Sequence, residues 1–127
     1  MLLLSYKNVS QKGDCYMAYI KNVEHEKALH FTEEVQVQQG QVVSKTLAQN
    51  KHVSVTLFAF SKGEEISAHD SSGDAMVSVI EGTGEFVIDG TSHTLSAGES
   101  IIMPAKKPHS VYAAEDFKMI LTVIFPE

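Results

Sequence analysis

The sequence has 127 residues, of which 43% are hydrophobic, a size that fits one domain with a single core and excludes two. The net charge is −6 and all ten basic residues are lysines, so arginine recognition of phosphate is excluded and nucleic-acid binding is not expected. The apolar start, Met1–Leu4, is too short for a signal peptide or a membrane span, and the single cysteine, Cys15, cannot form an internal disulfide. We therefore expect a cytoplasmic protein that binds neither membranes nor nucleic acids.

The first part of the chain, about residues 1–36, is predicted to be an N-terminal extension of the domain. Tyr16, Ala18 and Ile20 alternate with their neighbours as in a short edge strand, and residues 23–35 favour a helical turn. No chemical motif is visible in this part. The extension and the remainder, about residues 37–127, are expected to form one domain over 1–127.

From Val37 onward the apolar residues recur at every second position, which is the pattern of half-buried strands. Turns fall at intervals of about ten residues, and the Asp89-Gly90 pair between two alternating runs is a strong hairpin signal. The predicted strands cover residues 41–47, 53–60, 66–69, 76–80, 85–88, 92–95, 100–103, 110–112 and 118–125. So many short strands predict an all-β sandwich or barrel.

Two stretches of the barrel carry the residues that are candidates for chemistry. Gly63–Gly82 contains a turn, a strand and His69 with acidic neighbours, and Gly98–His109 contains a turn, a strand, a proline and a histidine. His69 and His109 therefore stand at the ends of strands about 40 residues apart, a separation that the fold must close. Because imidazole titrates near neutral pH, either one is a candidate catalytic acid or base.

The spacing in these stretches resembles the two motifs of the cupin superfamily. The first motif begins with glycine, five residues and His-x-His, continues with a glutamate and ends with a glycine. The second begins with glycine, five residues and Pro-x-Gly, and continues with a histidine. The residues that fit are Gly63, His69, Gly82, Gly98, Pro104 and His109. The resemblance implies a small jelly roll, the double-stranded β-helix of two antiparallel sheets that forms a cupin barrel.

The metal ligands that the resemblance implies are only half present. Ser71 stands where the family has its second histidine and Ala75 where it has glutamate, so only His69 and His109 remain. Two neutral imidazoles lack the charge and the fixed geometry that a third histidine and a carboxylate give a divalent metal. Asp74 is a weak substitute ligand, because in a regular strand it points away from the face of Ala75 unless a bulge turns it inward.

The inner face of the barrel is expected to form a small, mostly apolar cavity around the two histidines. This prediction rests on strand parity, because side chains at every second position of a strand lie on the same face. Ser71 is expected to be the polar group that orients a ligand in the cavity. The predicted lining residues are Ser71, Ala75, Val77, Val79, Val111 and Ala113.

The sequence holds more large apolar side chains than one inner face is expected to bury. Because cupins commonly pair through a sheet face, the resemblance predicts a homodimer; alternatively, these side chains fill the space between the two sheets. The residues concerned are Phe58, Phe60, Met103 and Phe125.

Three function classes remain open. The preferred one is a non-catalytic cupin that binds a small molecule, because half of the metal ligands are missing. The alternative is a metal-dependent enzyme of dioxygenase, isomerase or decarboxylase type, in which His69, His109 and a further carboxylate hold one Zn, Fe, Mn, Ni or Cu ion. A nucleotide-sugar epimerase of the same superfamily is disfavoured, because it uses a phosphate-binding arginine and the chain has none.

Overall fold

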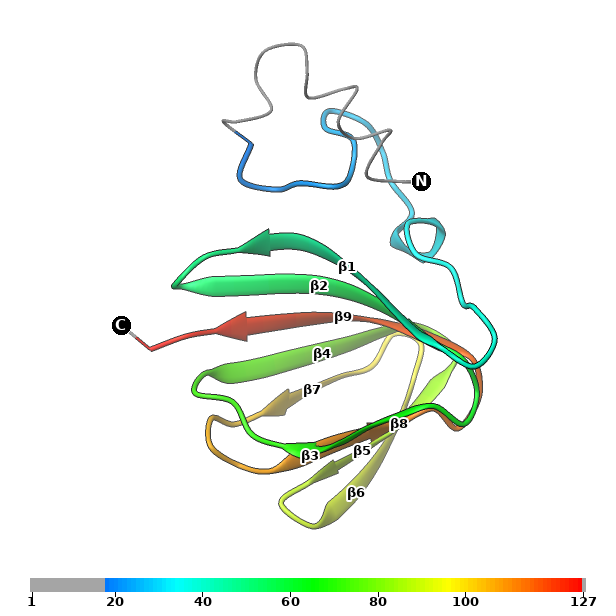
Figure 1. The fold of residues 1–127 in the computed structure, drawn as a ribbon, viewed down its shortest axis with the longest axis vertical. Coiled ribbons are helices and arrows are strands. Elements are labelled where there is room, and N and C mark those ends of the chain that lie inside the picture. Colours follow the sequence, from blue (N-terminus) through cyan, green and yellow to red (C-terminus); the bar gives the residue numbers. More distant parts are fainter. Residues whose placement is uncertain (1–17, 127) are drawn as a thin grey trace.

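The computed structural model describes residues 18–126, and almost all regular structure in that range is β-strand (Figure 1). The strands are β1 (Val42–Gln49), β2 (Val53–Phe60), β3 (Glu65–His69), β4 (Asp74–Glu81), β5 (Thr83–Ile88), β6 (Thr91–Ser96), β7 (Ser100–Met103), β8 (His109–Tyr112) and β9 (Phe117–Ile124). They form a five-stranded sheet in the order β1-β2-β9-β4-β7 and a four-stranded sheet in the order β3-β8-β5-β6. Every pairing is antiparallel, so the predicted two-sheet β-fold is confirmed.

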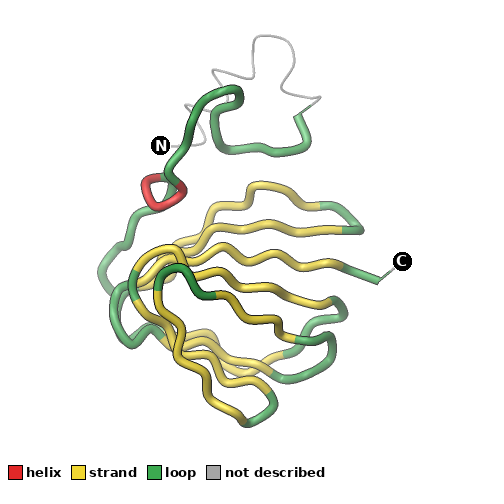
Figure 2. The backbone as a smooth tube through the Cα atoms, turned by 180° about the vertical axis from the view of Figure 1, so that it is seen from behind, coloured by secondary structure: helices red, strands yellow, loops and turns green. Residues whose placement is uncertain are grey.

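The two sheets face each other across one hydrophobic core, and the loops lie at its edges (Figure 2). Phe60 on β2 stacks on Phe117 on β9 with ring centroids 4.7 Å apart, and Phe86 on β5 meets Phe117 edge-on from the other sheet. The Phe117 ring also explains Gly84, because a Cβ at that position would stand 2.7 Å from the ring. Phe117 is thus the contact that joins the two sheets.

The Asp89-Gly90 turn joins β5 and β6 as a tight hairpin. Both residues have positive φ, 49° and 86°, as the turn type that matches the twist of a hairpin requires. Ile88 pairs with Thr91 directly across the turn. This hairpin prediction is confirmed.

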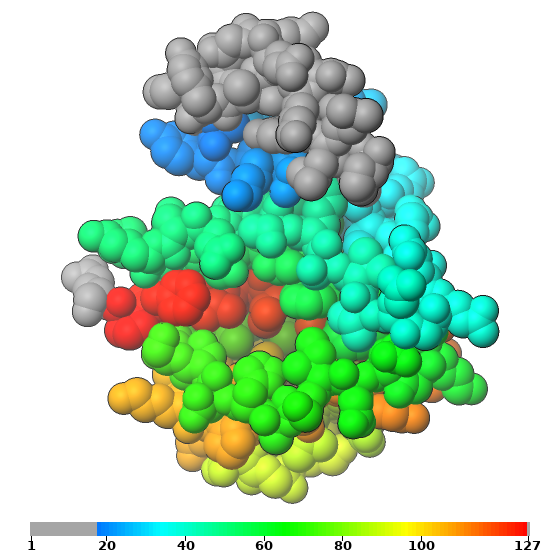
Figure 3. Space-filling view, in the orientation of Figure 1, coloured from blue at the N-terminus to red at the C-terminus, as the bar shows by residue number. Residues whose placement is uncertain are grey.

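A second hydrophobic cluster lies on the opposite face of the five-stranded sheet, beneath residues 18–41. Val23 and Val35 of this extension pack against Leu47, Leu57 and Ala59 of β1 and β2. In the space-filling view the blue and cyan extension lies directly against β1 (Figure 3). The extension therefore covers an apolar surface that β1 and β2 would otherwise expose to water.

The extension is also tied to the edge of the sheet by polar contacts. The Lys21 amide donates to the Leu47 carbonyl at 2.7 Å, at the point where a bulge interrupts the β1–β2 register. Edge strands left open invite pairing with other chains, so this contact protects β1.

The predicted local structure of the extension is only partly correct. The helical turn expected within residues 23–35 is present as a 3-10 turn, η2 (Phe31–Glu33). Residues 18–20 form no strand, contrary to the predicted edge strand, and Tyr16 and Cys15 lie outside the described residues. Within residues 18–126, no helix has the length and hydropathy to span a membrane.

The four large side chains considered for a dimer surface lie inward. Phe60 and Met103 are buried in the main core, and Phe58 and Phe125 are partly buried against it. They therefore fill the space between the sheets, which was the alternative interpretation. The homodimer itself stays a prediction and must rest on other residues.

Candidate functional site

The fold brings His69 and His109 together at one end of the four-stranded sheet. They are direct cross-strand partners on β3 and β8, and their ring centroids lie 4.4 Å apart with the planes at 66°. The expected meeting of the two histidines is therefore present in the structure.

A β-bulge places His69 on this face. Ile66 pairs with Val111 and His69 with His109, so β3 has one residue more than β8 between these pairs. Without the bulge, simple alternation from Ile66 would turn His69 to the other face of the sheet. The bulge thus makes the histidine pair possible.

Both rings are fixed in the same way, by a contact between Nδ1 and a backbone carbonyl. Nδ1 of His69 lies 2.9 Å from the carbonyl oxygen of Ser67, and Nδ1 of His109 lies 3.1 Å from that of Lys107. A carbonyl only accepts hydrogen bonds, so in each neutral ring Nδ1 carries the proton and Nε2 carries the free lone pair. The pair therefore offers two acceptor nitrogens.

The two rings differ in their exposure to solvent. His109 is only 5% exposed, whereas His69, on the edge strand, is exposed. Among the described residues, no buried side-chain nitrogen or oxygen lacks a hydrogen-bond partner, and Nε2 of His109 has none. Nε2 of His109 therefore keeps a small accessible area, and its lone pair takes part in no hydrogen bond within the described residues.

The surroundings of His109 favour its neutral form. Burial lowers its pKa below the usual value of 6.5, and the neighbouring His69 lowers the pKa further. The Lys107 carbonyl and the Asp70 carboxylate oppose this shift. The two carbonyls were not expected from the sequence, because backbone acceptors leave no residue signature.

The predicted pocket residues on β4 and β8, and Ala113 just after β8, face the interior, where they belong to the main core. Their side chains are at most 4% exposed and pack in the same cluster as Phe60, Phe86 and Phe117. They are Ala75, Val77, Val79, Val111 and Ala113. Strand parity thus identified buried positions, and a ligand cavity lined by them stays a prediction.

The two polar candidates beside the pair are engaged in holding loops. The Ser71 hydroxyl accepts from the Gly73 amide at 3.1 Å, and the Ser71 carbonyl accepts from the Lys106 amide at 2.8 Å. Asp74 is exposed at the start of β4, where its Oδ1 accepts from the Ala105 amide at 2.8 Å. Asp74 alternates with buried Ala75, as parity predicts.

The donor set does not fit a metal held by this chain alone. Residues 18–126 contain no group of three or more His, Cys, Asp or Glu side chains arranged to bind a metal ion. His69 and His109 form a pair, and neither Ser71 nor Asp74 completes a set around them. Metal sites of this kind require three or four protein ligands.

A second polar site, missed by the sequence analysis, lies under the extension. Lys45 on β1 is buried, and it shares the apolar outer face of the strand with Val43 and Leu47. A lysine at a strand position that shares a face with buried apolar residues is the sequence signal that could have revealed this site.

Comparisons with known proteins agree with this architecture. Residues 56–125 match the family model described as Cupin domain. A conserved protein of unknown function from Streptococcus pyogenes superposes with a TM-score of 0.86 at 45% identity, covering 87% of this chain and 97% of that one. A cupin superfamily protein from Desulfitobacterium hafniense gives a TM-score of 0.82 at 28% identity, with coverages of 86% and 100%.

A third similar structure is a cupin 2 conserved barrel domain protein from Leptotrichia buccalis, with a TM-score of 0.72 at 38% identity over 73% of this chain and 45% of that one. A search of curated proteins finds no match. The family match covers more than half of the chain, and the Streptococcus protein is similar over nearly its whole length. The chain belongs to the cupin family.

Proposed function

We propose that this cupin binds a small organic molecule through His69 and His109. The observation that carries the proposal is the locked orientation of the two rings, each with Nδ1 on a carbonyl and Nε2 free. The net charge of −6 also favours a small molecule over nucleic acid as the partner.

The chemistry of the pair selects a ligand that donates hydrogen bonds. Two neutral imidazoles with protonated Nδ1 atoms present two acceptors and no free donor. A hydroxyl or N–H group of the ligand satisfies them, whereas a carboxylate offers them nothing while they stay neutral. Burial keeps His109 in the neutral form at neutral pH.

The experiment is to identify what the protein carries. Protein purified under native conditions is denatured, and the small molecules released are compared by mass spectrometry between the wild type and His69→Ala/His109→Ala. We expect a hydroxyl- or amine-bearing compound near one equivalent in the wild type and its loss in the double variant. His52→Ala, which removes an exposed histidine away from the pair, is the matched control and retains the compound.

Two results would contradict the proposal. One is the same compound at the same occupancy in the wild type and the double variant. The other is a released ligand without any hydrogen-bond donor.

The alternative, a metal-dependent enzyme, has one observation in its favour. Histidines that bind metals usually donate the second ring N–H to a carbonyl or carboxylate, and both rings do so here. The described residues nevertheless lack a third ligand, so we assign no catalytic step to a metal. Metal content is therefore the measurement that decides between the two functions.

A further inference from the structure

We infer that the chain has a second small-molecule site, under the N-terminal extension, for a small primary amine that also carries an oxygen acceptor. The cavity has a volume of about 240 Å³ and lies between residues 22–34 and β1. It is separate from His69 and His109, which are not among its lining residues. This volume is below the roughly 300–1,000 Å³ of pockets for drug-sized ligands, so it suits a smaller metabolite.

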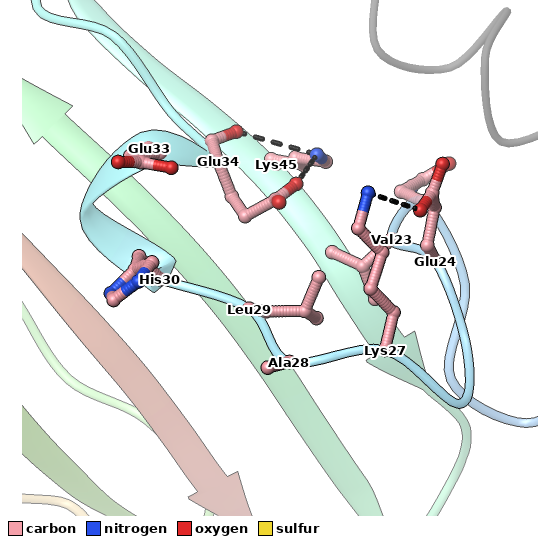
Figure 4. A pocket seen from close by; sticks show the side chains of 10 residues that line it. Val23, Glu24, Lys27, Ala28, Leu29, His30, Glu33, Glu34 and Lys45 are labelled. Atoms are coloured by element: carbon pink, nitrogen blue, oxygen red, sulfur yellow. Dashed lines mark hydrogen bonds and ion pairs between the residues drawn. The ribbon is translucent and has the colours of Figure 1, made fainter.

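Lys45 supplies the hydrogen-bond donor of this site. Figure 4 shows its ammonium group beside Glu34, and the Lys45 side chain is only 7% exposed. Nζ donates to Glu34 Oε1 at 2.9 Å and to the Glu34 carbonyl oxygen at 3.3 Å. An ammonium group has three donors, so one N–H of Lys45 is left for a ligand oxygen.

Carboxylates supply the acceptors. Glu34 Oε1 accepts from Lys45, and Glu34 Oε2 has no partner among the described residues. Glu24, also at the cavity, is paired with Lys27 at 3.0 Å, and Glu33 lines the far end with His30. The lining thus holds one more carboxylate than ammonium groups, which favours a ligand with a positively charged group and disfavours a simple anion.

The remaining wall is apolar and short. Val23, Ala28 and Leu29 border the cavity, and the Leu29 side chain extends toward Val23 (Figure 4). This wall accommodates a few carbon atoms between the amine and the oxygen. An amino acid and an amino alcohol both carry an amine and an oxygen acceptor. They differ in net charge, because the amino acid is a zwitterion and the amino alcohol is a cation.

The test is a titration of the ¹⁵N-labelled full chain followed by NMR. The probes are glycine and ethanolamine, with acetate and methylamine as probes that carry one group each. We expect saturable shifts of amides in residues 22–34 and 45–47 with glycine or ethanolamine, and binding about tenfold weaker or more for acetate and methylamine, since each loses a charge-assisted hydrogen bond. If ethanolamine binds more tightly than glycine, the ligand class is a cationic amine. If glycine binds more tightly, the ligand class is a zwitterion.

Two variants locate the site. Lys45→Met is expected to weaken binding about tenfold or more, because it removes the donor. Its matched control is Lys118→Met: Lys118 is equally buried beneath the extension and donates to the Thr32 carbonyl at 2.6 Å, but it does not line the cavity. This control should bind within about twofold of the wild type.

Glu34→Gln keeps the inference testable if Lys45→Met fails to fold. The glutamine oxygen still accepts from Lys45, but the negative charge that holds the amine is lost, so ethanolamine binding should fall about tenfold. Unchanged affinity in Glu34→Gln, unchanged affinity in a folded Lys45→Met, or no saturable shift with glycine or ethanolamine would each overturn the inference.

Discussion

Both faces of the five-stranded sheet bury apolar side chains, but by different means. The inner face packs against the other sheet through aromatic rings such as Phe60 and Phe117. Part of the outer face is covered by the irregular extension, with Val35 in a small apolar cluster and with the buried lysines Lys45 and Lys118. The inner face thus forms the barrel core with the four-stranded sheet, which carries the histidine site, and the outer face adds a separable layer with polar chemistry of its own.

The largest expected effect is the loss of the ring that joins the sheets. Phe117→Ala should lower the free energy of unfolding by about 3–5 kcal/mol, because Phe117 is fully buried and contacts both Phe60 and Phe86. Urea denaturation measures the change. Ile124→Ala, at an exposed position of the same strand, is the control and should change stability by no more than about 0.5 kcal/mol.

A smaller effect is expected from the outer face. Val35→Ala should cost about 2 kcal/mol, since Val35 is 2% exposed but the variant removes only two carbon atoms. Limited proteolysis should cut within residues 22–34 sooner than in the wild type, while the barrel remains resistant. Equal proteolysis rates in Val35→Ala and in the control Gln36→Ala, at an exposed neighbour, would show that the extension is not a separable layer.

The difference between the faces also explains what could be predicted from the sequence. The alternation around Ala75, Val77 and Val79 and the Asp89-Gly90 turn are local signals, so the strands and the two-sheet fold followed from them. The pairing of His69 with His109 depended on the resemblance to cupins. Parity alone would have misplaced His69, because the bulge in β3 has no marker residue such as glycine or proline.

The outer layer could not be predicted in the same way. Residues 18–41 contain little periodic structure, and their position is set by contacts with distant residues, such as the hydrogen bond between Lys21 and Leu47. The burial of Lys45 follows from the carboxylate of Glu34, 11 positions earlier, and no repeating pattern connects the two. Long-range polar pairs of this kind become visible only in the structure.

The histidine site should make the free energy of unfolding depend on pH. The folded pKa of His109 is below its unfolded value, so between these two values the unfolded chain binds more protons. Stability contributed by neutral His109 is therefore complete above about pH 6.5 and is lost as the pH falls toward the folded pKa. His109→Gln should flatten this part of the stability curve, measured by thermal unfolding at several pH values. An unchanged slope in the variant would contradict the assignment.

The smallest effect on stability is expected at the exposed part of the outer face. Met76 and Ile102 are cross-strand partners on β4 and β7, 43% and 53% exposed, and we assign the predicted homodimer contact to this adjacent apolar pair. Ile102→Lys should change the free energy of unfolding by no more than about 0.5 kcal/mol and should shift a dimer to the monomer in sedimentation. A single 13.9 kDa species in the wild type would end the dimer prediction.

The most direct test of the central claim, that His69 and His109 form a ligand site without a resident metal, is elemental analysis. The protein is purified without chelator or affinity tag, and its content of Fe, Mn, Ni, Cu and Zn is compared with that of His69→Ala/His109→Ala. We predict far less than one metal ion per chain in both proteins. A stoichiometric metal in the wild type that disappears in the double variant would contradict it.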